Sequence, residues 1–539
     1  MSDKKKISRR GFLKDAAIAS AAVATGGVLG TTSAQAQSQT PATGLPDKWD
    51  YDVDVLIAGA GNGGCTAFMT AASGGAKTLL IEISSVTGGS SLISGAQLHT
   101  TGLRTWEDYN KGTYFRHDQV LAKVFVETFW NKLIPFLKSK NVATSQPFPG
   151  TAGMAGDYRL GIYGPNDPQP AETNVALGAQ GHRDYFDSVI KAGKDAGGTV
   201  MTKTRSLKLY TDDQRRVVGM QASVWSTSPL EKDQKLINIK AKKVILCTGN
   251  IYANKELMTR YVSPYADNCR MYGLNPYQNG DGLLMALAVG AKAGGAWSSW
   301  SGSNQAVYPP DTRIATNPDK YEKFITTTDP KTWIQVLQDE RPVVPFSGTS
   351  ITVNLDGKRF LYGIAFQYLG VAFVIADQKA FDSDSTSAAK IAAIKAKGQN
   401  VYTANTLEDF ATLLSNSVQM NRLGLLNTIA AYNKACDDKT TDKLDPPMAA
   451  PVAPATYWKV STPPFYAVEI ASTMYFIMGG LTINADAQVL DAQRVPIPNL
   501  YAAPPCAGGV MRGTYTGGIA CAGTFGYLAA LHAVANLKA

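Results

Sequence analysis

The chain has 539 residues, of which 45% are hydrophobic and 50 are glycines, a composition typical of an ordered, loop-rich α/β enzyme with two or more domains and unlike a disordered or fibrous chain. The formal net charge at pH 7 is +9, and residues 1–36 contribute +4 of it through six Lys/Arg and two Asp, which leaves +5 on the other residues. No basic stripe is interleaved with aromatic residues, so we expect no nucleic-acid partner.

Residues 1–36 have the pattern of an export signal. A twin-arginine motif at residues 8–14 (SRRGFLK) precedes an Ala/Gly-rich apolar stretch, and residues 34–36 (AQA) form a candidate cleavage site. A membrane-anchoring helix is the alternative, but the apolar run is short and weakly hydrophobic, without a stop-transfer flank. We therefore expect twin-arginine export of the folded protein to the periplasm, a linker at residues 37–50, and no stable membrane insertion.

A βαβ unit follows the linker. Residues 52–58 predict a buried strand that ends at a glycine-rich loop, a helix continues to about residue 76, and a second strand at 78–81 ends in Glu82. In this pattern the glycines allow a tight turn and a close approach to a pyrophosphate, the helix N-terminus donates N–H groups, and the acidic residue accepts ribose hydroxyls. The residues predicted to bind a dinucleotide are Gly59, Gly61, Asn62, Gly63, Gly64 and Glu82.

A second small-residue loop, at residues 88–95 (GGSSLISG), selects among dinucleotides. A flavin enzyme wraps such a loop around the pyrophosphate and ribityl chain, whereas a nicotinamide enzyme does not need it. The predicted cofactor contacts in this loop are Gly89, Ser90, Ser91, Ser94 and Gly95. The sequence therefore favours FAD.

Two later segments return the chain to the cofactor. After a helix near 185–197 and a hairpin near 202–221, residues 243–250 (KVILCTGN) predict a buried strand that ends in a turn containing Thr248 and Gly249. Asp281, within residues 279–282 (NGDG), opens a predicted helix at 283–290 and is expected near the ribityl hydroxyls. A simple helix cap is the alternative role of Asp281.

Residues 305–455 are rich in Pro, Lys and aromatic residues and contain no nucleotide loop, which favours an inserted substrate domain. We expect a strand and turn around residues 352–357 and a helix from 407 to about 414 within it. Residues 51–304 and 456–539 then form the cofactor domain, with strands near 481–483 and 499–503. The predicted fold class is α/β: a Rossmann-like FAD-binding domain of the glutathione-reductase type with an inserted α+β catalytic domain.

The six cysteines include no Cys-x-x-Cys pair and the four histidines are scattered, so we expect no metal site. Cys65, Cys247 and Cys521 lie in small-residue cofactor segments and are expected to be buried thiols. Residues 510–518 (VMRGTYTGG) put Tyr515 on a glycine-rich turn that opens a helix. If this turn and the loop at 59–64 close around one cofactor, the phenol lies where chemistry on that cofactor occurs.

Taken together, these motifs resemble the flavoprotein superfamily of fumarate reductases and 3-ketosteroid Δ1-dehydrogenases, over nearly all of residues 50–536. The remaining matching segments are residues 354–360 (NLDGKRF), 478–481 (MGGL), 489–491 (VLD) and 496–503 (PIPNLYAA). The resemblance implies non-covalent FAD, because no histidine occupies the early loop where covalent members attach it. It adds Gly480, Ala503, Ala520 and Cys521 to the expected cofactor contacts.

The resemblance separates two branches. Dicarboxylate reductases have an arginine after Gly-Lys-Arg-Phe as proton donor, an arginine before the C-terminal Gly-Gly pair as carboxylate clamp, and a histidine before Met-Gly-Gly. Here those places hold roughly 367–368 (QY), Tyr515 and 476–477 (FI), and Arg512 lies three positions too early. Because a carboxylate clamp needs a guanidinium fork, we expect succinate and fumarate to be poor substrates.

The C-terminal pattern, including residues 524–530 (TFGYLAA), is instead similar to the ketosteroid dehydrogenases. The resemblance implies that the Tyr515 hydroxyl and the amide of Gly518 or Ile519 bind a ketone oxygen as an oxyanion hole, and that Tyr368 removes the α proton. Flavin N5 then takes the β hydrogen as hydride. The alternative for either tyrosine is a packing role, and Tyr158 or Tyr163 is a candidate support for the base.

Departures from the family indicate a divergent member. Residues 362–363 (YG) replace the usual Asn-Glu, and Pro504-Pro505 replace an acidic residue. We expect dehydrogenation of a cyclic ketone, either a 3-ketosteroid or a smaller cyclohexanone type, with a quinone or soluble carrier as electron acceptor. The alternatives are a periplasmic reductase of an α,β-unsaturated acid or enone, like the fumarate and urocanate reductases, and a non-catalytic flavin-binding module. Against the reductase, the chain has neither the haem domain nor the FMN-carrying domain that often supply such enzymes with electrons.

Overall fold

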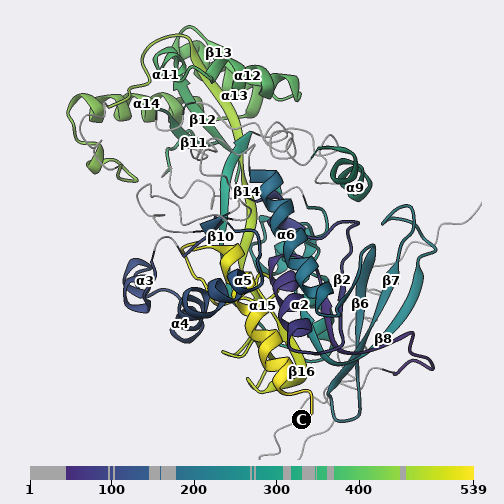
Figure 1. Ribbon diagram of the computed structural model, residues 1–539. Coiled ribbons are helices and arrows are strands. Elements are labelled where there is room, and N and C mark those ends of the chain that lie inside the picture. Colours follow the sequence, from purple (N-terminus) through teal and green to yellow (C-terminus); the bar gives the residue numbers. More distant parts are fainter. Residues whose placement is uncertain are drawn as a thin grey trace, which may run out of the picture. The chain divides into compact units, whose positions relative to one another are not determined.

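Two sheets and a pair of short strands organise the described part of the chain in the computed structural model (Figure 1). The structure describes residues 44–94, 97–100, 103–144, 158–159, 178–266, 270–271, 275–306, 317–329, 346, 349–360, 370–448 and 457–538. Residues 44–538 belong to one compact unit. The predicted site residues Gly95 and Tyr368, and Tyr163 as a candidate support for the base, lie outside the described residues.

The first sheet has eight strands among the described residues, in the order β15-β16-β8-β1-β2-β5, with the β6–β7 hairpin attached to β8 through β7. β16, β8, β1, β2 and β5 are parallel. The strands are β1 (Tyr51–Ala58), β2 (Thr78–Ile81), β5 (Thr199–Met201), β6 (Thr204–Thr211), β7 (Val217–Val224), β8 (Lys235–Leu246), β15 (Gln488–Leu490) and β16 (Pro496–Ala502). The end of β1 is fully buried, as a continuous apolar run in a central parallel strand requires.

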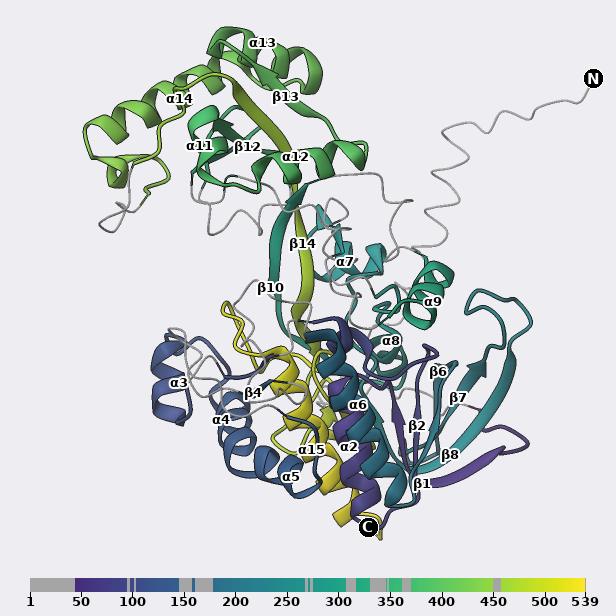
Figure 2. The same ribbon diagram turned by 45° about the horizontal axis from the view of Figure 1, so that its top comes forward.

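Three helices pack in a layer on this sheet: α2 (Asn62–Ser73) lies between α15 (Gly518–Ala535) and α6 (Gly178–Asp195) (Figures 1 and 2). Small residues bring α2 and α15 together, because a Cβ on Gly526 would lie only 2.0 Å from the backbone oxygen of Gly63. α2 ends at Ser73 rather than near residue 76. Gly75, with φ +82°, follows the end of this helix in the left-handed conformation that glycine tolerates best.

The second sheet runs β10-β14-β12-β11, with β13 and β9 also paired to β14. Its strands are β9 (Arg270–Met271), β10 (Ala293–Ala306), β11 (Ile351–Asn354), β12 (Ala372–Asp377), β13 (Val401–Ala404) and β14 (Phe465–Leu481). The predicted short strand near 481–483 is therefore the end of a 17-residue strand. Its aromatic and β-branched residues suit a long ladder, and β10 pairs with it antiparallel along most of its length.

Helices cover the second sheet and enclose two smaller apolar clusters, one around Phe410 and Leu425 and one around Ala376 and Ile394. They are α11 (Gln378–Ser383), α12 (Ser387–Ala396), α13 (Leu407–Val418) and α14 (Arg422–Asp437). The helix predicted at 407–414 is confirmed as α13, which continues to Val418.

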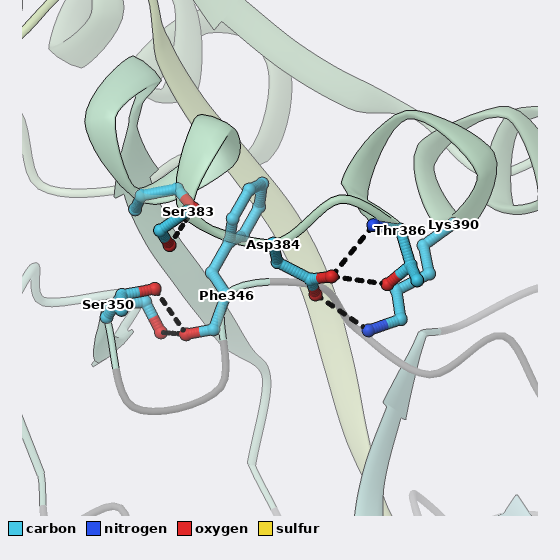
Figure 3. Close-up of polar contacts among 8 residues, drawn as sticks. Phe346, Ser350, Ser383, Asp384, Thr386 and Lys390 are labelled. Carbon is cyan, nitrogen blue, oxygen red and sulfur yellow. Dashed lines mark hydrogen bonds and ion pairs between the residues drawn. The ribbon is translucent and has the colours of Figure 1, made fainter. Parts of the chain in front are cut away.

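The carboxylate of Asp384 stabilises the turn between α11 and α12 (Figure 3). Asp384 accepts hydrogen bonds from the Thr386 amide at 2.8 Å and the Thr386 hydroxyl at 2.5 Å, and pairs with Lys390 Nζ at 2.8 Å. The hydrogen bond from Lys390 is the largest of the causes that lower the pKa of Asp384 to about 2. Nearby, the Ser350 hydroxyl donates to the backbone oxygen of Phe346 at 2.9 Å.

The remaining described elements lie on connecting segments. They are η1 (Gly89–Ile93), β3 (Gln97–Leu98), α3 (Trp106–Gly112), α4 (Gln119–Thr128), η2 (Phe129–Leu133), α5 (Ile134–Ser139), β4 (Tyr158–Arg159), α7 (Lys255–Tyr261), α8 (Asp281–Ala288), α9 (Pro318–Thr327) and η8 (Thr441–Lys443). Among the described helices, α15 alone has the length and apolar character to cross a membrane, and 67% of it is buried within the protein. The mixed α/β fold class predicted from the sequence is confirmed.

Candidate active site

The glycine-rich loop after β1 is shaped by close backbone approaches. Gly59 has φ +95°, and a Cβ there would lie 2.4 Å from the backbone oxygen of Cys247. A Cβ on Gly64 would lie 1.8 Å from the Gly59 oxygen, so the first turn of α2 packs directly on the loop. By contrast, a Cβ on Gly61 would meet no atom within 4 Å. The backbone of Gly61 is therefore open on the side where a phosphate can approach the helix N-terminus.

Asn62 joins this loop to the C-terminal helix. Its side chain is 1% exposed, its Nδ2 donates to the backbone oxygen of Ile519 at 2.8 Å, and its Oδ1 accepts from the Tyr185 hydroxyl at 2.9 Å. A buried amide with both ends hydrogen-bonded fixes the relative position of the segments that it connects. The loop at 59–64 therefore meets the first turns of α15, the helix that follows residues 510–518.

A cleft of about 710 Å³, part of it open to solvent, lies along the carboxyl ends of β1, β2 and β8. It brings together most of the predicted cofactor contacts. They are Gly59, Gly61, Asn62, Gly63, Glu82, Gly89, Ser90, Ser91, Thr248, Gly249 and Asp281. Its other lining residues include some that the sequence did not indicate, namely Thr204, Arg205, Ser206, Asn275, Tyr277, Gln278, Pro504, Pro505 and Ala522. Tyr277 and Gln278 directly precede the 279–282 motif, a position that could have suggested them, whereas nothing in the sequence marks Arg205.

Some predicted contacts lie behind the cleft rather than along it. Gly480 faces the backbone of residues 506–508, where a Cβ would lie 2.5 Å from the Cys506 oxygen. Ala503 packs beside Gly63, and the buried Ala520 and Cys521 belong to the first turn of α15. Ser94 ends η1 and donates its hydroxyl to the Ser91 oxygen at 2.8 Å. Their roles as cofactor contacts stay predictions.

The five cysteines in the described residues are free and buried, which confirms the expectation for Cys65, Cys247 and Cys521. Burial raises the pKa of each of these three thiols. They are therefore protonated near neutral pH and poor nucleophiles. Within the part of the chain that the structure describes, no three His, Cys, Asp or Glu residues gather as a metal site.

Glu82 directly follows β2 and lies inside the cleft, with its carboxylate held in place by two backbone amides. Oε2 accepts from the Ala60 amide at 2.5 Å and Oε1 from the Ser84 amide at 2.9 Å. Burial raises the pKa of Glu82 to about 7; the backbone hydrogen bonds oppose this and the nearby charge of Glu322 adds to it. Each oxygen keeps acceptor capacity for a ribose hydroxyl.

We expect FAD binding to the apoprotein to weaken as the pH falls from 8 to 6. Ribose hydroxyls donate to the ionised Glu82 carboxylate and so lower its pKa on binding. Protonation of free Glu82 below about 7 therefore opposes binding, by at most about tenfold per pH unit. Titration of FAD fluorescence at each pH measures the dissociation constant, and Glu82→Gln should remove the slope. A slope that persists in this variant would assign it to another group.

Asp281 lines the cleft, and its expected place near the ribityl hydroxyls stays a prediction. Gly280, not Asp281, is the N-cap of α8, so the simple cap is excluded. The Asp281 carboxylate instead receives two parallel hydrogen bonds from Arg205, from Nε at 2.9 Å and from a terminal nitrogen at 2.9 Å. Both residues line the cleft, and the hydrogen bond to Asp281 raises the pKa of Arg205. Asp281 is thus a cleft residue whose carboxylate is already paired.

The turn before α15 brings the predicted oxyanion pair together. Gly517, with φ +114°, is the N-cap of α15, and a Cβ on it would lie 2.0 Å from the backbone oxygen of His99. The Tyr515 hydroxyl lies 2.9 Å from the position that a Cβ on Gly518 would occupy. The Tyr515 hydroxyl therefore lies close to Gly518, the first residue of a helix whose first amides, those of Gly518 and Ile519, have no partner within the helix. Such donors can bind a developing negative charge on oxygen.

Two rings flank Tyr515. The Phe476 ring is edge-on, with centroids 5.4 Å apart, and the His99 ring is tilted at 6.4 Å. Burial lowers the pKa of His99 to about 4, so this imidazole is neutral near neutral pH. The flanking surfaces therefore suit an uncharged molecule.

The comparisons with known proteins agree with this geometry. The profile of the FAD binding domain family matches residues 54–520. The chain belongs to this family. FAD is its cofactor, which fits the open glycine loop, the ribose-facing carboxylate and the cleft described above.

Relatives and solved structures extend the likeness over most of the chain. A probable fumarate reductase from Shewanella frigidimarina (strain NCIMB 400) is 25% identical over 526 residues, covering 90% of this chain and 77% of the relative. A vinyl phenol reductase from Lactiplantibacillus plantarum is 25% identical over 494 residues, covering 86% and 91%. A 3-ketosteroid Δ1-dehydrogenase from Sterolibacterium denitrificans has the same fold, with a TM-score of 0.64 at 16% identity, covering 90% of this chain and all of that one. The predicted superfamily is confirmed: this is an FAD-dependent oxidoreductase of a family that acts on CH–CH and C=C bonds.

Proposed function

We propose that this flavoprotein dehydrogenates a cyclic ketone, a 3-ketosteroid or a smaller cyclohexanone type, to the α,β-enone. The observation that carries the proposal is the Tyr515 hydroxyl beside Gly518 at the N-terminus of α15. A ketone oxygen accepts from both, and the enolate charge that develops on it is stabilised where the donors converge. Polarisation of the carbonyl acidifies the neighbouring α C–H bond.

The residues have distinct roles in this proposal. The residues that line the cleft hold FAD non-covalently, with Glu82 on the ribose and the open backbone of Gly61 toward the pyrophosphate. FAD supplies the hydride acceptor. Tyr515 and the amide of Gly518 or Ile519 orient the ketone, and Tyr368 takes the α proton. A phenol with an ordinary pKa of about 10 needs a neighbouring group that lowers its pKa or relays its proton to act as base near neutral pH.

The flanking rings support an uncharged substrate. By the resemblance, Tyr515 and roughly residues 476–477 (FI) stand where dicarboxylate reductases of the superfamily have a clamping arginine and a histidine. Burial keeps His99 neutral. A carboxylate placed between these rings would lose its hydration without gaining an ionic partner from them, which is costly.

The second candidate is a reductase of an α,β-unsaturated acid or enone. It is favoured by the relatives, because the probable fumarate reductase and the vinyl phenol reductase are both named as reductases. The same donors would hold the substrate oxygen in either direction. The direction then depends on the reduction potential of the bound flavin and on the partner, a quinone or a soluble carrier.

We further propose that the protein acts in the periplasm after twin-arginine export. The support is the twin-arginine motif around Arg9 and Arg10, which lies outside the described residues. Replacing both arginines by lysine should retain the protein in the cytoplasm, as measured by cell fractionation. Unchanged periplasmic protein would refute the export route.

Anaerobic flavin spectroscopy tests the function directly. Mature protein with FAD is mixed with cyclohexanone or with a 4-ene-3-ketosteroid while the flavin absorbance is followed. Bleaching by one of them supports the dehydrogenase and selects the substrate size. No bleaching by either ketone, together with reoxidation of dithionite-reduced enzyme by an α,β-unsaturated acid, would replace the proposal by the reductase.

A further inference from the structure

A fully buried tyrosine lies against the Tyr515 turn. Tyr109, in α3, is 0% exposed, and its hydroxyl is hydrogen-bonded to the hydroxyl of Thr516, which is itself 1% exposed. Thr516 is the residue between Tyr515 and Gly517. The α3–α4 region lies beside the segment that leads into α15 (Figure 2). The Tyr109–Thr516 hydrogen bond is therefore a side-chain anchor of the turn. It is separate from the donors proposed for substrate, which are the Tyr515 hydroxyl and the amide of Gly518 or Ile519.

His117 extends this anchor to the start of the turn. Its Nδ1 lies 3.4 Å from the Tyr109 hydroxyl, and the two rings are perpendicular with centroids 5.5 Å apart. Burial lowers the pKa of His117 to about 4, and a hydrogen bond with the backbone of Val510 opposes this. A neutral imidazole thus packs against Tyr109, near the first residue of the turn.

A residue that precedes α3, His99, contacts the far end of the turn. Its backbone oxygen lies 2.0 Å from the position that a Cβ on Gly517 would occupy. The turn is therefore fixed at Thr516 and at Gly517 by residues between His99 and His117. The contact at Thr516 is made by side chains alone and can be removed without changing the backbone.

We propose that Tyr109 is a positioning residue, which holds Thr516 so that the neighbouring Tyr515 hydroxyl stays aligned with the Gly518 amide, and that His117 supports Tyr109. The inference rests on the proposed function of Tyr515. Burial raises the pKa of Tyr109, so its phenol stays protonated near neutral pH. Its effect is on alignment, for which displacements of about 1 Å can cost about 100-fold in rate.

Removal of single hydroxyls tests the contact in the holoenzyme. Tyr109→Phe and Thr516→Val should each lower kcat for the bleaching ketone by about tenfold or more, with a smaller change in KM, because the alignment serves the developing charge. The double variant should have a kcat no lower than that of either single variant, since both substitutions remove the same hydrogen bond. Thr516→Ser keeps the hydroxyl and should restore kcat. Tyr210→Phe is the matched control. Tyr210 is a buried tyrosine outside the cleft whose hydroxyl donates to Asn238 at 2.8 Å, and removal of this hydroxyl should leave kcat unchanged.

Amide hydrogen exchange of residues 510–520 separates the two ways to fail. If the wild type oxidises no ketone, the proposed function fails, yet faster exchange in Tyr109→Phe than in Tyr210→Phe would still establish the anchor. If the wild type oxidises a ketone and Tyr109→Phe keeps its kcat and exchange rates, losing only thermal stability, the positioning role is overturned. Additive losses in the double variant would also overturn it.

Discussion

Replacing Tyr515 by phenylalanine is expected to lower the rate of flavin reduction by a ketone about 10²–10³-fold while FAD stays bound. This is the usual cost of removing one donor from an oxyanion site. The ring remains to pack against Phe476, so the turn should keep its shape. Stopped-flow absorbance under anaerobic conditions measures the rate, and the flavin spectrum reports cofactor occupancy.

A tyrosine on the same helix provides the control. Tyr527 lies in α15 against Phe136, with ring centroids 5.1 Å apart, and is not part of the turn. In Tyr527→Phe, the ketone should reduce the flavin at the wild-type rate. Equal rates in wild type and Tyr515→Phe would leave Tyr515 with a packing role and remove the basis for the oxyanion site.

Two alanine substitutions in the cofactor loop should affect different properties, one the stability of the fold and the other the affinity for FAD. Gly64→Ala places a methyl group 1.8 Å from the Gly59 oxygen, a backbone atom that cannot yield, so it should destabilise the fold by about 3 kcal/mol or more. Gly61→Ala meets no protein atom within 4 Å and should leave the apoprotein within about 0.5 kcal/mol of wild type. Its methyl group faces the pyrophosphate approach, so FAD affinity should fall about 100-fold.

Thermal unfolding with and without FAD distinguishes the two variants. Gly64→Ala should unfold earlier in both conditions, whereas Gly61→Ala should lose only the stabilisation that FAD provides. Gly44→Ala, with no atom within 4 Å of its Cβ, controls for the substitution itself. Wild-type FAD affinity in Gly61→Ala would place the pyrophosphate elsewhere in the cleft.

The cofactor loops were predictable from the sequence because their signals are local. Gly59, Gly61 and Glu82 stand at the spacing that is typical of a dinucleotide-binding strand–helix–strand unit, and all three line the cleft. The end of α2 was misjudged because Ala76 continues the apolar pattern, while Gly74 and Gly75 already end the helix. Helix capping overrode periodicity there.

Contacts between distant segments were not predictable. Tyr109 and Thr516 are 407 residues apart, and Arg205 and Asp281 are 76 apart, so no local pattern connects either pair. The ion pair adds to Asp281 a partner that no local rule would indicate. The extent of β14 was missed for a similar reason, since a partner strand some 170 residues away stabilises it.

The length of β14 has a consequence for cooperativity. Its first residues pair with β12 and β13, and its last residues pair with β10 next to the cofactor segments, at Gly480. The apolar cluster around Phe410 and the cofactor segments are thus joined by one long strand, whose ladder with β10 has register shifts at Ala296/Trp300 and Ser301/Gly302, rather than by a loose connection. Melting of the region around Phe410 should therefore coincide with release of FAD, and a single denaturation transition should report both events.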